Sequence, residues 1–335
     1  MDRAITPFGD KIIEEDDIRF TSFGGMVIRD WTHCQGWAAE DGLRFSRQKS
    51  ANEHVWNRNL EANLPYIDKS LENVKPESGG KHEGQTCFLT ADGFSLSKNG
   101  HHLIDCPHVI ETNRVYPGVQ PEYYVSVDCG YPFNGSNPEW VCDVDKEKTT
   151  GVFSVFVRPE IAKKFSNKLW FDAWGKGRVL SNRLNKEKPF VKSLDTALNV
   201  SFTALCLAWR LGFKRIVLAG FDYCYQDGYN HFLDSAPTIL TRGGKLQIET
   251  NERELLEKGR NTLLCDNGVF STKEWLDAMK YFATQCWFLI ESGVEIVNAT
   301  EGGILNMPFI PSVKLLDEVS KVKKGNECQK IKAKS

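Results

Sequence analysis

The stretch that decides the fold class is Leu211-Gly212-Phe213-Lys214-Arg215-Ile216-Val217-Leu218-Ala219-Gly220-Phe221-Asp222. Just before it, Leu194–Leu211 carries apolar residues at three- and four-residue spacing, which predicts an amphipathic helix that Gly212 ends. Within it, the apolar run Arg215–Gly220 predicts a strand that is buried on both faces. A helix that leads directly into such a strand is typical of a parallel sheet with right-handed crossovers.

The same alternation of short apolar runs and longer amphipathic segments extends from Gln85 to about residue 312. A second helix is predicted at Thr272–Ser292, beginning with the capping-box sequence Ser271-Thr272-Lys273-Glu274 and ended by Gly293. The other predicted strands are Thr86–Ala91, His108–Thr112, Tyr123–Asp128, Val152–Val157 and Val294–Asn298. We therefore predict an α/β fold, with a Rossmann-like, mostly parallel sheet and helices on both faces, over residues 85–312.

The two ends of the chain differ from this region in composition. Residues 1–84 are polar and show little periodicity, which predicts an irregular N-terminal extension that ends in a linker rich in turn formers and charge. Residues 313–335 concentrate lysines, and we interpret them as a basic C-terminal tail, solvated and frayed rather than a nucleic-acid patch.

Composition excludes several classes of protein. No apolar run approaches the roughly 18 residues of a membrane span, and residues 1–17 lack the apolar core of a secretory signal. The ten cysteines form no Cys-x-x-Cys pair and several lie in apolar runs, so we expect reduced thiols and a cytoplasmic location. A net charge of −2 gives no general attraction to nucleic acid, and we expect none as a partner.

Ligands of open parallel sheets bind at the carboxyl ends of the strands, so the residues that follow each strand are the candidate site. Glycine permits close backbone approach to an oxyanion, hydroxyls and arginine bind phosphate, and asparagine or aspartate can hold a base or a ribose. The candidate nucleotide-binding residues are Gly93, Ser95, Asn113, Arg114, Asp128, Thr300, Gly302 and Gly303.

One strand end also offers groups for proton transfer. Asp222 follows the strand of the opening stretch, Tyr223 and Tyr225 come next, and His231 lies nine residues after Asp222. An imidazole with an acid nearby suits proton transfer near neutral pH, while the phenols could hydrogen-bond a departing phosphate. We predict that these four residues are catalytic, with His231 as the base.

Two other kinds of site are not favoured. The sequence His101-His102-Leu103-Ile104-Asp105-Cys106-Pro107-His108 has ligand types for zinc but lacks a second ligand pair at standard spacing, so no metal site is predicted. Gly93-Phe94-Ser95-Leu96-Ser97 departs from the Gly-x-Ser-x-Gly turn of hydrolases at its last residue.

Taken in order, these segments resemble the family named for archaeal 6-hydroxymethylpterin diphosphokinase, which includes the bacterial motility accessory factors. The matching segments are Gly93-Phe94-Ser95-Leu96, Asn113-Arg114, Pro121–Asp128, Leu211–Asp222 with His231, Asn267–Thr272 and Asn298–Gly303. The same landmarks are similar to bacterial sialyltransferases that use CMP-sugars. The family's loop proline is Phe94 here, and Asp92 places a negative charge beside the loop.

The resemblance implies a nucleotide phosphate on the Ser95 loop and Asn113 near the sugar or base. It predicts a metal-independent glycosyltransferase that moves a sugar from a CMP-type nucleotide donor to a glycan, pterin or protein acceptor, with no tightly bound cofactor. One alternative is a diphosphokinase that uses magnesium and ATP, although Ser126-Val127-Asp128-Cys129-Gly130 offers one carboxylate where the archaeal enzymes have two. Another is a degenerate, non-catalytic member that binds a nucleotide or a protein. The sequence leaves the oligomeric state open.

Overall fold

The computed structural model describes residues 4–5, 12–13, 18–20, 26–28, 55–71, 82–127, 141, 143–173, 179–191, 200–226, 232, 240–242, 245–247, 262–264 and 269–332. The chain divides into two compact units, each built from two separate stretches of sequence. Unit 1 comprises Met1–Glu83 and Tyr123–Gly212, and unit 2 comprises Gly84–Glu122 and Phe213–Ser335.

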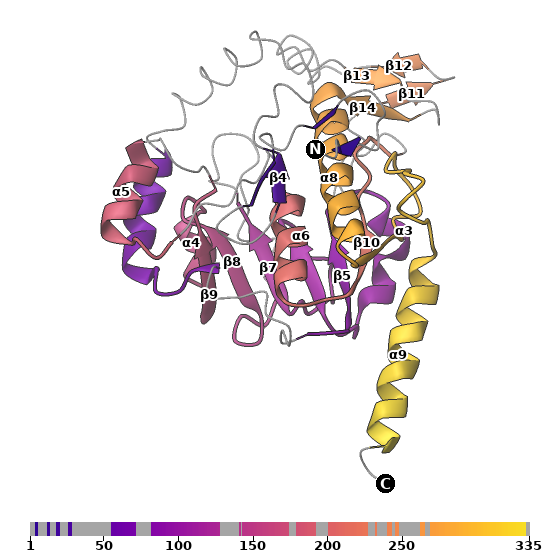
Figure 1. The fold of residues 1–335 in the computed structure, drawn as a ribbon, viewed down its shortest axis with the longest axis horizontal. Coiled ribbons are helices and arrows are strands. Elements are labelled where there is room, and N and C mark those ends of the chain that lie inside the picture. Colours follow the sequence, from indigo (N-terminus) through magenta and orange to yellow (C-terminus); the bar gives the residue numbers. More distant parts are fainter. Residues whose placement is uncertain are drawn as a thin grey trace. The chain divides into compact units, whose positions relative to one another are not determined.

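Unit 2 is built on four parallel strands in the order β15-β10-β5-β6. Figure 1 labels two of them, β5 and β10. The four strands are β5 (Thr86–Thr90), β6 (Val109–Thr112), β10 (Arg215–Ala219) and β15 (Glu295–Asn298). Nearly all of their residues are buried, as expected where both faces of a parallel sheet are covered.

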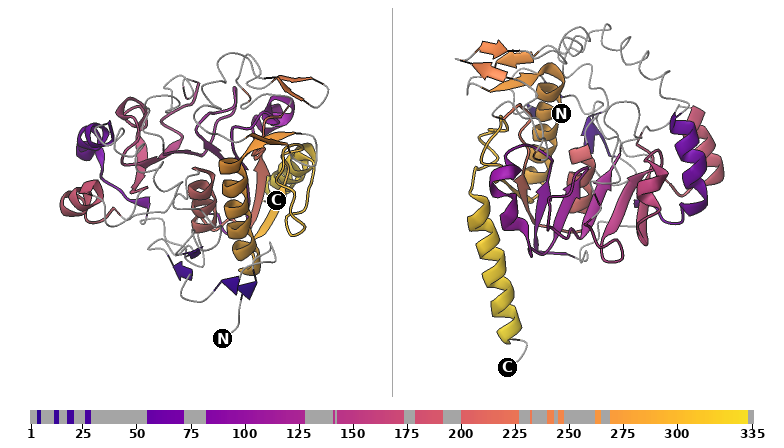
Figure 2. Two further views of the ribbon diagram at one scale, coloured as in Figure 1. Left: turned by 90° about the horizontal axis from the view of Figure 1, so that it is seen from above. Right: turned by 180° about the vertical axis from the view of Figure 1, so that it is seen from behind.

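Helices cover both faces of this sheet, as Figure 2 shows for α8 and α9 on either side of β10. The helical segments are α3 (Leu96–Asn99), the 3₁₀ turn η4 (Gly100–Leu103), α8 (Lys273–Glu291) and α9 (Leu315–Lys332). Val217 of β10 packs in one apolar core with Leu315 of α9. Because side chains alternate along a strand, its buried neighbour Leu218 points to the opposite face.

Unit 1 contains three parallel strands in the order β7-β8-β9. They are β7 (Tyr123–Ser126), β8 (Thr150–Ser154) and β9 (Asn167–Phe171), with helices α4 (Pro159–Ala162), α5 (Val179–Glu187) and α6 (Val200–Arg210). An aromatic cluster forms its core: the ring of Tyr124 stacks on Phe165, and Phe153 lies between Phe165 and Trp170.

Part of the predicted N-terminal extension is regular and packed. Residues 55–63 are helical and continue into the 3₁₀ turn η2 (Leu64–Tyr66). The buried side-chain amide of Asn63 donates to the carbonyls of Val155 and Val157, at 3.1 and 2.9 Å. That helix therefore belongs to the body of unit 1, which its polar composition did not indicate.

The remaining strands of the described part of the chain form four antiparallel pairs of two or three residues each. They are β1 (Ala4–Ile5) with β2 (Ile12–Ile13), β3 (Ile18–Phe20) with β4 (Met26–Ile28), β11 (Leu240–Arg242) with β12 (Lys245–Gln247), and β13 (Thr262–Leu264) with β14 (Phe270–Thr272).

The predicted fold class is confirmed: both units have parallel sheets and α/β connections of Rossmann type. Strand positions agree to within a residue or two, except that β8 begins and ends earlier than predicted and β9 was missed. The two helix stops at Gly212 and Gly293 are also confirmed, with φ of 89° and 86°.

Two details of the prediction were wrong. Helix α8 begins at Lys273, so Ser271 precedes the cap position, and its hydroxyl donates to the Tyr223 carbonyl at 2.7 Å. The basic tail is not frayed, because α9 covers Leu315–Lys332 and buries Val319 against the core.

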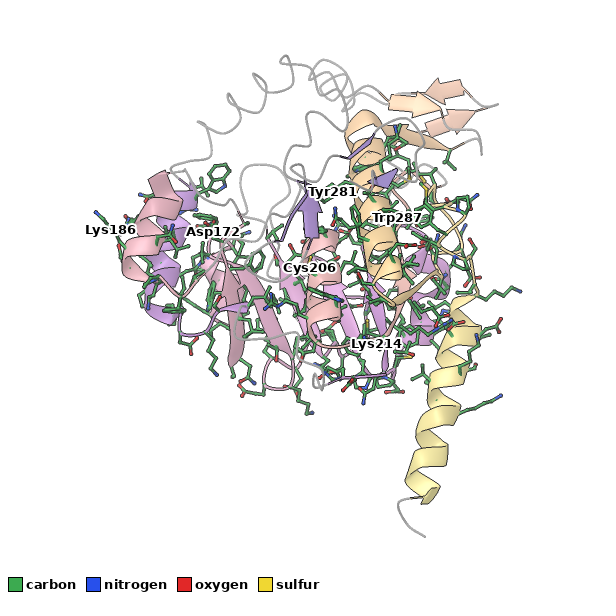
Figure 3. All side chains as sticks on the ribbon, in the orientation of Figure 1. Asp172, Lys186, Cys206, Lys214, Tyr281 and Trp287 are labelled. Carbon is green, nitrogen blue, oxygen red and sulfur yellow. The ribbon has the colours of Figure 1, made fainter. Side chains whose placement is uncertain are left out.

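Cys87, Cys106, Cys206, Cys224 and Cys286 are buried free thiols, as predicted for small apolar side chains. Figure 3 labels Cys206 on α6 and Tyr281 on α8. Among the helices that the structure describes, none has both the length and the apolar character that a membrane crossing requires.

Candidate functional site

Loops after three neighbouring strands of unit 2 meet at the carboxyl edge of the sheet. The Gly93 amide, after β5, donates to the carbonyl of Gly220 at the end of β10 (3.0 Å). The Phe221 amide donates to the hydroxyl of Thr300, which follows β15 (3.1 Å). Because parallel strands end at one edge, the loops of Gly93, Asp222 and Thr300 lie together.

Asp222 is the centre of this arrangement. Its side chain is 2% exposed, and Oδ2 accepts the backbone amide of Ser95 at 2.8 Å. Its carbonyl accepts the amide of Ile304 at 2.9 Å, which ties in the loop after β15. Oδ1 is also buried and accepts no hydrogen bond from the residues that the structure describes. One carboxylate thus holds the Ser95 loop while leaving an acceptor oxygen unused.

Burial raises the pKa of Asp222 from 3.8 to about 6, and the nearby charge of Asp92 acts in the same direction. Hydrogen bonding by Ser95 and the positive charge of Lys98 oppose this rise. Asp222 therefore changes protonation state close to neutral pH, unlike an ordinary aspartate.

Two glycines allow the loops to approach so closely. A Cβ on Gly93 would collide with the carbonyl oxygen of Gly220 and lie 2.6 Å from Cγ of Asp222. A Cβ on Gly303, where φ is +73°, would lie 2.5 Å from the Cα of Asp222. Only a residue without a side chain fits at either position.

The turn Thr300–Gly303 lies against the Ser95 loop. A Cβ built on Gly302 would be 3.3 Å from the Cβ of Ser95. Gln226 fixes the turn from the other side, because its Oε1 accepts the Gly303 amide at 3.2 Å. Gln226 was not among the predicted site residues, because it stands among the aromatic residues after β10 and carries no motif of its own.

The loop after β6 joins the same edge. Asn113 has a φ of +55°, and the Arg114 amide donates to the Thr112 carbonyl at 2.7 Å, which makes a γ-turn. This turn brings Nε of Arg114 to 3.8 Å from Oδ2 of Asp92. The guanidinium therefore offsets part of the negative charge that Asp92 places beside the Ser95 loop.

Sequence reasoning missed two further buried polar residues at this edge. The amide nitrogen of Asn99, in α3, lies 3.4 Å from both the Thr300 carbonyl and Oε1 of Glu301. Glu111, in β6, is fully buried, accepts the Tyr116 amide on both oxygens at 3.2 Å, and burial raises its pKa well above the usual value. Glu111 could have been predicted, because it is a carboxylate inside an apolar strand. The sequence around Asn99 gives no comparable indication.

The tyrosines predicted to act near Asp222 turn towards helix α8. The ring of Tyr223 packs beside Phe282, with centroids 6.2 Å apart, and the ring of Tyr225 lies 4.8 Å from that of Trp275. Both residues therefore follow the strand end as predicted, with rings packed on residues of the helix.

Asp128 and His231 lie outside the described residues, so their predicted roles stay predictions. Phe232, the residue after His231, is described: its amide donates to the Asp92 carbonyl at 3.3 Å, and its ring packs on Tyr116. Of the histidines weighed for zinc, His101 and His102 have ring centroids 3.9 Å apart, and Nδ1 of His108 lies 2.8 Å from Oε2 of Glu122.

The fold is similar to two solved structures. The MAf glycosyltransferase from Magnetospirillum magneticum AMB-1 matches with a TM-score of 0.49 and 13% identity, covering 81% of this chain and 41% of that one. This chain thus spans less than half the length of that protein. The sialyltransferase CstII from Campylobacter jejuni, in complex with a substrate analogue, cytidine-5′-monophosphate, matches with a TM-score of 0.35 and 12% identity, covering 70% and 87%.

Sequence comparison places the chain more firmly. No curated protein matches it significantly. The sequence model of the 6-hydroxymethylpterin diphosphokinase MptE-like family matches residues 58–228, just over half of the chain, and includes the loops of Ser95, Arg114 and Asp222. The resemblance drawn from the motifs is therefore confirmed, and the chain belongs to the 6-hydroxymethylpterin diphosphokinase MptE-like family.

Proposed function

We propose that this protein is a nucleotide-dependent transferase, and specifically a glycosyltransferase that moves a sugar from a CMP-type donor to a hydroxyl acceptor without a metal ion. The observation that carries the proposal is the convergence of the Ser95, Arg114, Asp222 and Thr300 loops at one edge of the sheet in unit 2. Such an edge is where α/β sheets bind nucleotides.

The donor's phosphate would lie on the loop of Gly93 and Ser95, with the turn Thr300–Gly303 on its other side. Arg114 and Lys98 supply positive charge near this position, since one is 3.8 Å from Asp92 and the other acts electrostatically on Asp222. Asn113 would contact the sugar or base, and Asp128 a ribose hydroxyl.

His231 would accept the proton of the acceptor hydroxyl as the sugar carbon is attacked. What supports this role is the hydrogen bond that ties its neighbour Phe232 to Asp92. Tyr223 and Tyr225 would hydrogen-bond the departing phosphate. A general base contributes at least about a hundredfold to rate, so His231→Ala should lower turnover by that factor. Turnover within about threefold of the wild type would assign the base elsewhere.

The engagement of Asp92 and Asp222 supports metal independence. Asp92 lies beside Arg114, and Oδ2 of Asp222 already accepts the Ser95 amide. A magnesium ion needs several oxygen ligands, so these carboxylates would first have to give up their present partners.

Family membership favours one alternative, a diphosphokinase that transfers from magnesium–ATP. The hydrogen bond between Ser95 and Asp222 favours another, a non-catalytic member, because it occupies an amide that a phosphate would use. Each alternative predicts a different ligand response.

A thermal-shift screen with CMP, CDP, ATP and GTP, each with and without magnesium, separates the three. A ligand that binds only the folded state at a hundred times its Kd stabilises it by about 2.7 kcal/mol. Sugar transfer predicts a rise in Tm with CMP that magnesium leaves unchanged. A rise that needs both ATP and magnesium supports the diphosphokinase. Nucleotide stabilisation without turnover of any donor supports the non-catalytic member, and no stabilisation by any nucleotide contradicts the proposal.

A further inference from the structure

The two loops proposed to hold phosphate already have their amides bound within the protein. The Ser95 amide donates to the Asp222 carboxylate, and the Gly303 amide donates to the side-chain amide oxygen of Gln226. A phosphate oxygen is an acceptor, so it can use either N–H group only after the resident acceptor moves away. The two resident acceptors differ in one property: only Asp222 can carry a charge.

A negative charge on Asp222 would repel a phosphate bound to the Ser95 loop. Asp222 is buried, its Oδ1 has no hydrogen-bond donor among the described residues, and the carboxyl group sits directly behind the Ser95 loop. A phosphate on that loop would place two negative charges side by side in a poorly solvated position, where repulsion is strong. Among the residues that the structure describes, the charged groups acting on Asp222 are Asp92, which adds repulsion, and Lys98, which relieves it.

We propose that Asp222 is a positioning residue that yields the Ser95 amide to the donor's phosphate only on taking up a proton, so that phosphate binding and protonation are coupled. The inference rests on the proposed function, because it assumes that a nucleotide phosphate binds the Ser95 loop. The proton comes from solvent, no covalent bond changes, and the neutral carboxyl group can then donate a hydrogen bond to a phosphate oxygen. Burial raises the pKa of Asp222 to about 6, so the carboxylate can take up a proton near neutral pH.

The coupling predicts a particular dependence of affinity on pH. Above the pKa of the free carboxyl group, each pH unit should weaken binding about tenfold, because one proton is taken up per ligand bound. CMP itself is unsuitable as the probe, since phosphate monoesters titrate near pH 6. The methyl ester of CMP, a phosphodiester with one fixed negative charge, avoids this complication.

Isothermal titration calorimetry of the full chain with the methyl ester of CMP tests the proposal. For the wild type we expect binding about tenfold weaker at pH 7.5 than at pH 6.5, and about one proton taken up per ligand in buffers with different ionisation heats. Asp222→Asn keeps an acceptor for the Ser95 amide but cannot ionise, so its affinity should change less than twofold between these pH values. Asp105→Asn is the matched control: Asp105 is an exposed carboxylate of unit 2 at φ +62°, which asparagine tolerates, and its pH dependence should equal the wild type's.

Gln226→Glu provides a second variant if Asp222→Asn does not fold. It places an ionisable acceptor on the Gly303 amide and should make the fall in affinity with pH steeper than in the wild type. Binding of the ester with no proton uptake overturns the coupling but leaves the proposed function standing. An Asp222→Asn variant with the wild-type pH dependence also overturns it. Failure of the ester to bind between pH 6 and pH 8 overturns both.

Discussion

Gly93 is the residue at which the geometry of the site allows the least change. In Gly93→Ala the new Cβ would meet the Gly220 carbonyl and the buried carboxyl group of Asp222, neither of which is a flexible chain end. We expect a loss of roughly 1–3 kcal/mol of stability and loss of the CMP-induced rise in Tm. Gly325→Ala is the control, because a Cβ at this position of helix α9 meets no other atom. It should leave the response to CMP unchanged and should leave stability unchanged or raise it slightly. An unchanged response to CMP in Gly93→Ala would remove this loop from the site.

Asp222 also makes the stability of the free protein depend on pH. Its pKa is higher folded than unfolded, so its contribution is complete below about pH 4 and is lost as pH rises through about 6. A change from 3.8 to about 6 corresponds to roughly 3 kcal/mol as an upper bound. Asp222→Asn should remove this loss, so its free energy of unfolding, relative to that of the wild type, should be larger at pH 8 than at pH 4. Urea titrations at the two pH values measure the difference in free energy of unfolding between the variant and the wild type. An equal difference at both pH values would show that the pKa of Asp222 is that of an ordinary aspartate.

The residues of the site divide according to what local sequence can reveal. Gly93, Arg114, Asp222 and Thr300 could be predicted because each follows a buried strand, and parallel topology brings strand ends together. Asn99 could not, because its partner Thr300 lies 201 residues along the chain. A side chain whose role depends on so distant a segment leaves no local pattern.

Among the elements, helix α9 is held by one buried acid as well as by its apolar contacts. Glu318 is 1% exposed, accepts Nη2 of Arg215 at 2.8 Å and Nζ of Lys321 at 2.7 Å, and Arg215 also pairs with Glu295. Glu318→Ala would remove one of the acidic partners of the Arg215 guanidinium. We expect a loss of about 2 kcal/mol of stability, which is below the range for fully buried pairs because Arg215 is partly exposed. Asp317→Ala removes the exposed neighbouring acid and should cost less than about 0.5 kcal/mol. Urea denaturation measures the stability of both variants. Equal losses of stability would show that Glu318 acts only through its charge at the helix end.

The elements that the sequence analysis missed have a common cause. β9 begins with exposed and half-exposed residues, Asn167 and Lys168, so only its last two residues look like a buried strand. α9 was interpreted as a tail because its lysines dominate the composition and conceal the contacts of Leu315 and Val319. By contrast β5, β6 and β10 are buried nearly throughout, and their apolar runs were sufficient to predict them.

For the whole molecule, the decisive question is whether turnover needs a metal ion. We expect sugar transfer from a CMP-sugar to change less than twofold in excess EDTA, since the carboxylates of Asp92 and Asp222 have other partners. Release of CMP measures the rate, and added magnesium provides the control for the chelator itself. Loss of activity in EDTA that magnesium restores would contradict the glycosyltransferase proposal and favour the diphosphokinase.

The division of the chain into units 1 and 2 could not be predicted from the composition of the sequence. The chain passes from one to the other after Glu83, Glu122 and Gly212, and a strand follows each of these points directly. The boundaries predicted from composition, at residues 84 and 312, stay predictions. After Glu122 and Gly212 the chain changes units between strands without a shift in composition.

The interleaved order of the strands has a consequence for how the protein is made. In unit 2, β5 pairs with β10, and β10 pairs with β15, so the first of these strands leaves the ribosome some 200 residues before the last. At roughly 5–20 residues per second, the nascent β5 waits on the order of 10–40 seconds for the sheet to be completed. Pairing between segments so far apart is intrinsically slow, and during that interval an apolar strand has no partner on one edge. We expect the growing chain to depend on holdase chaperones until β15 has been synthesised.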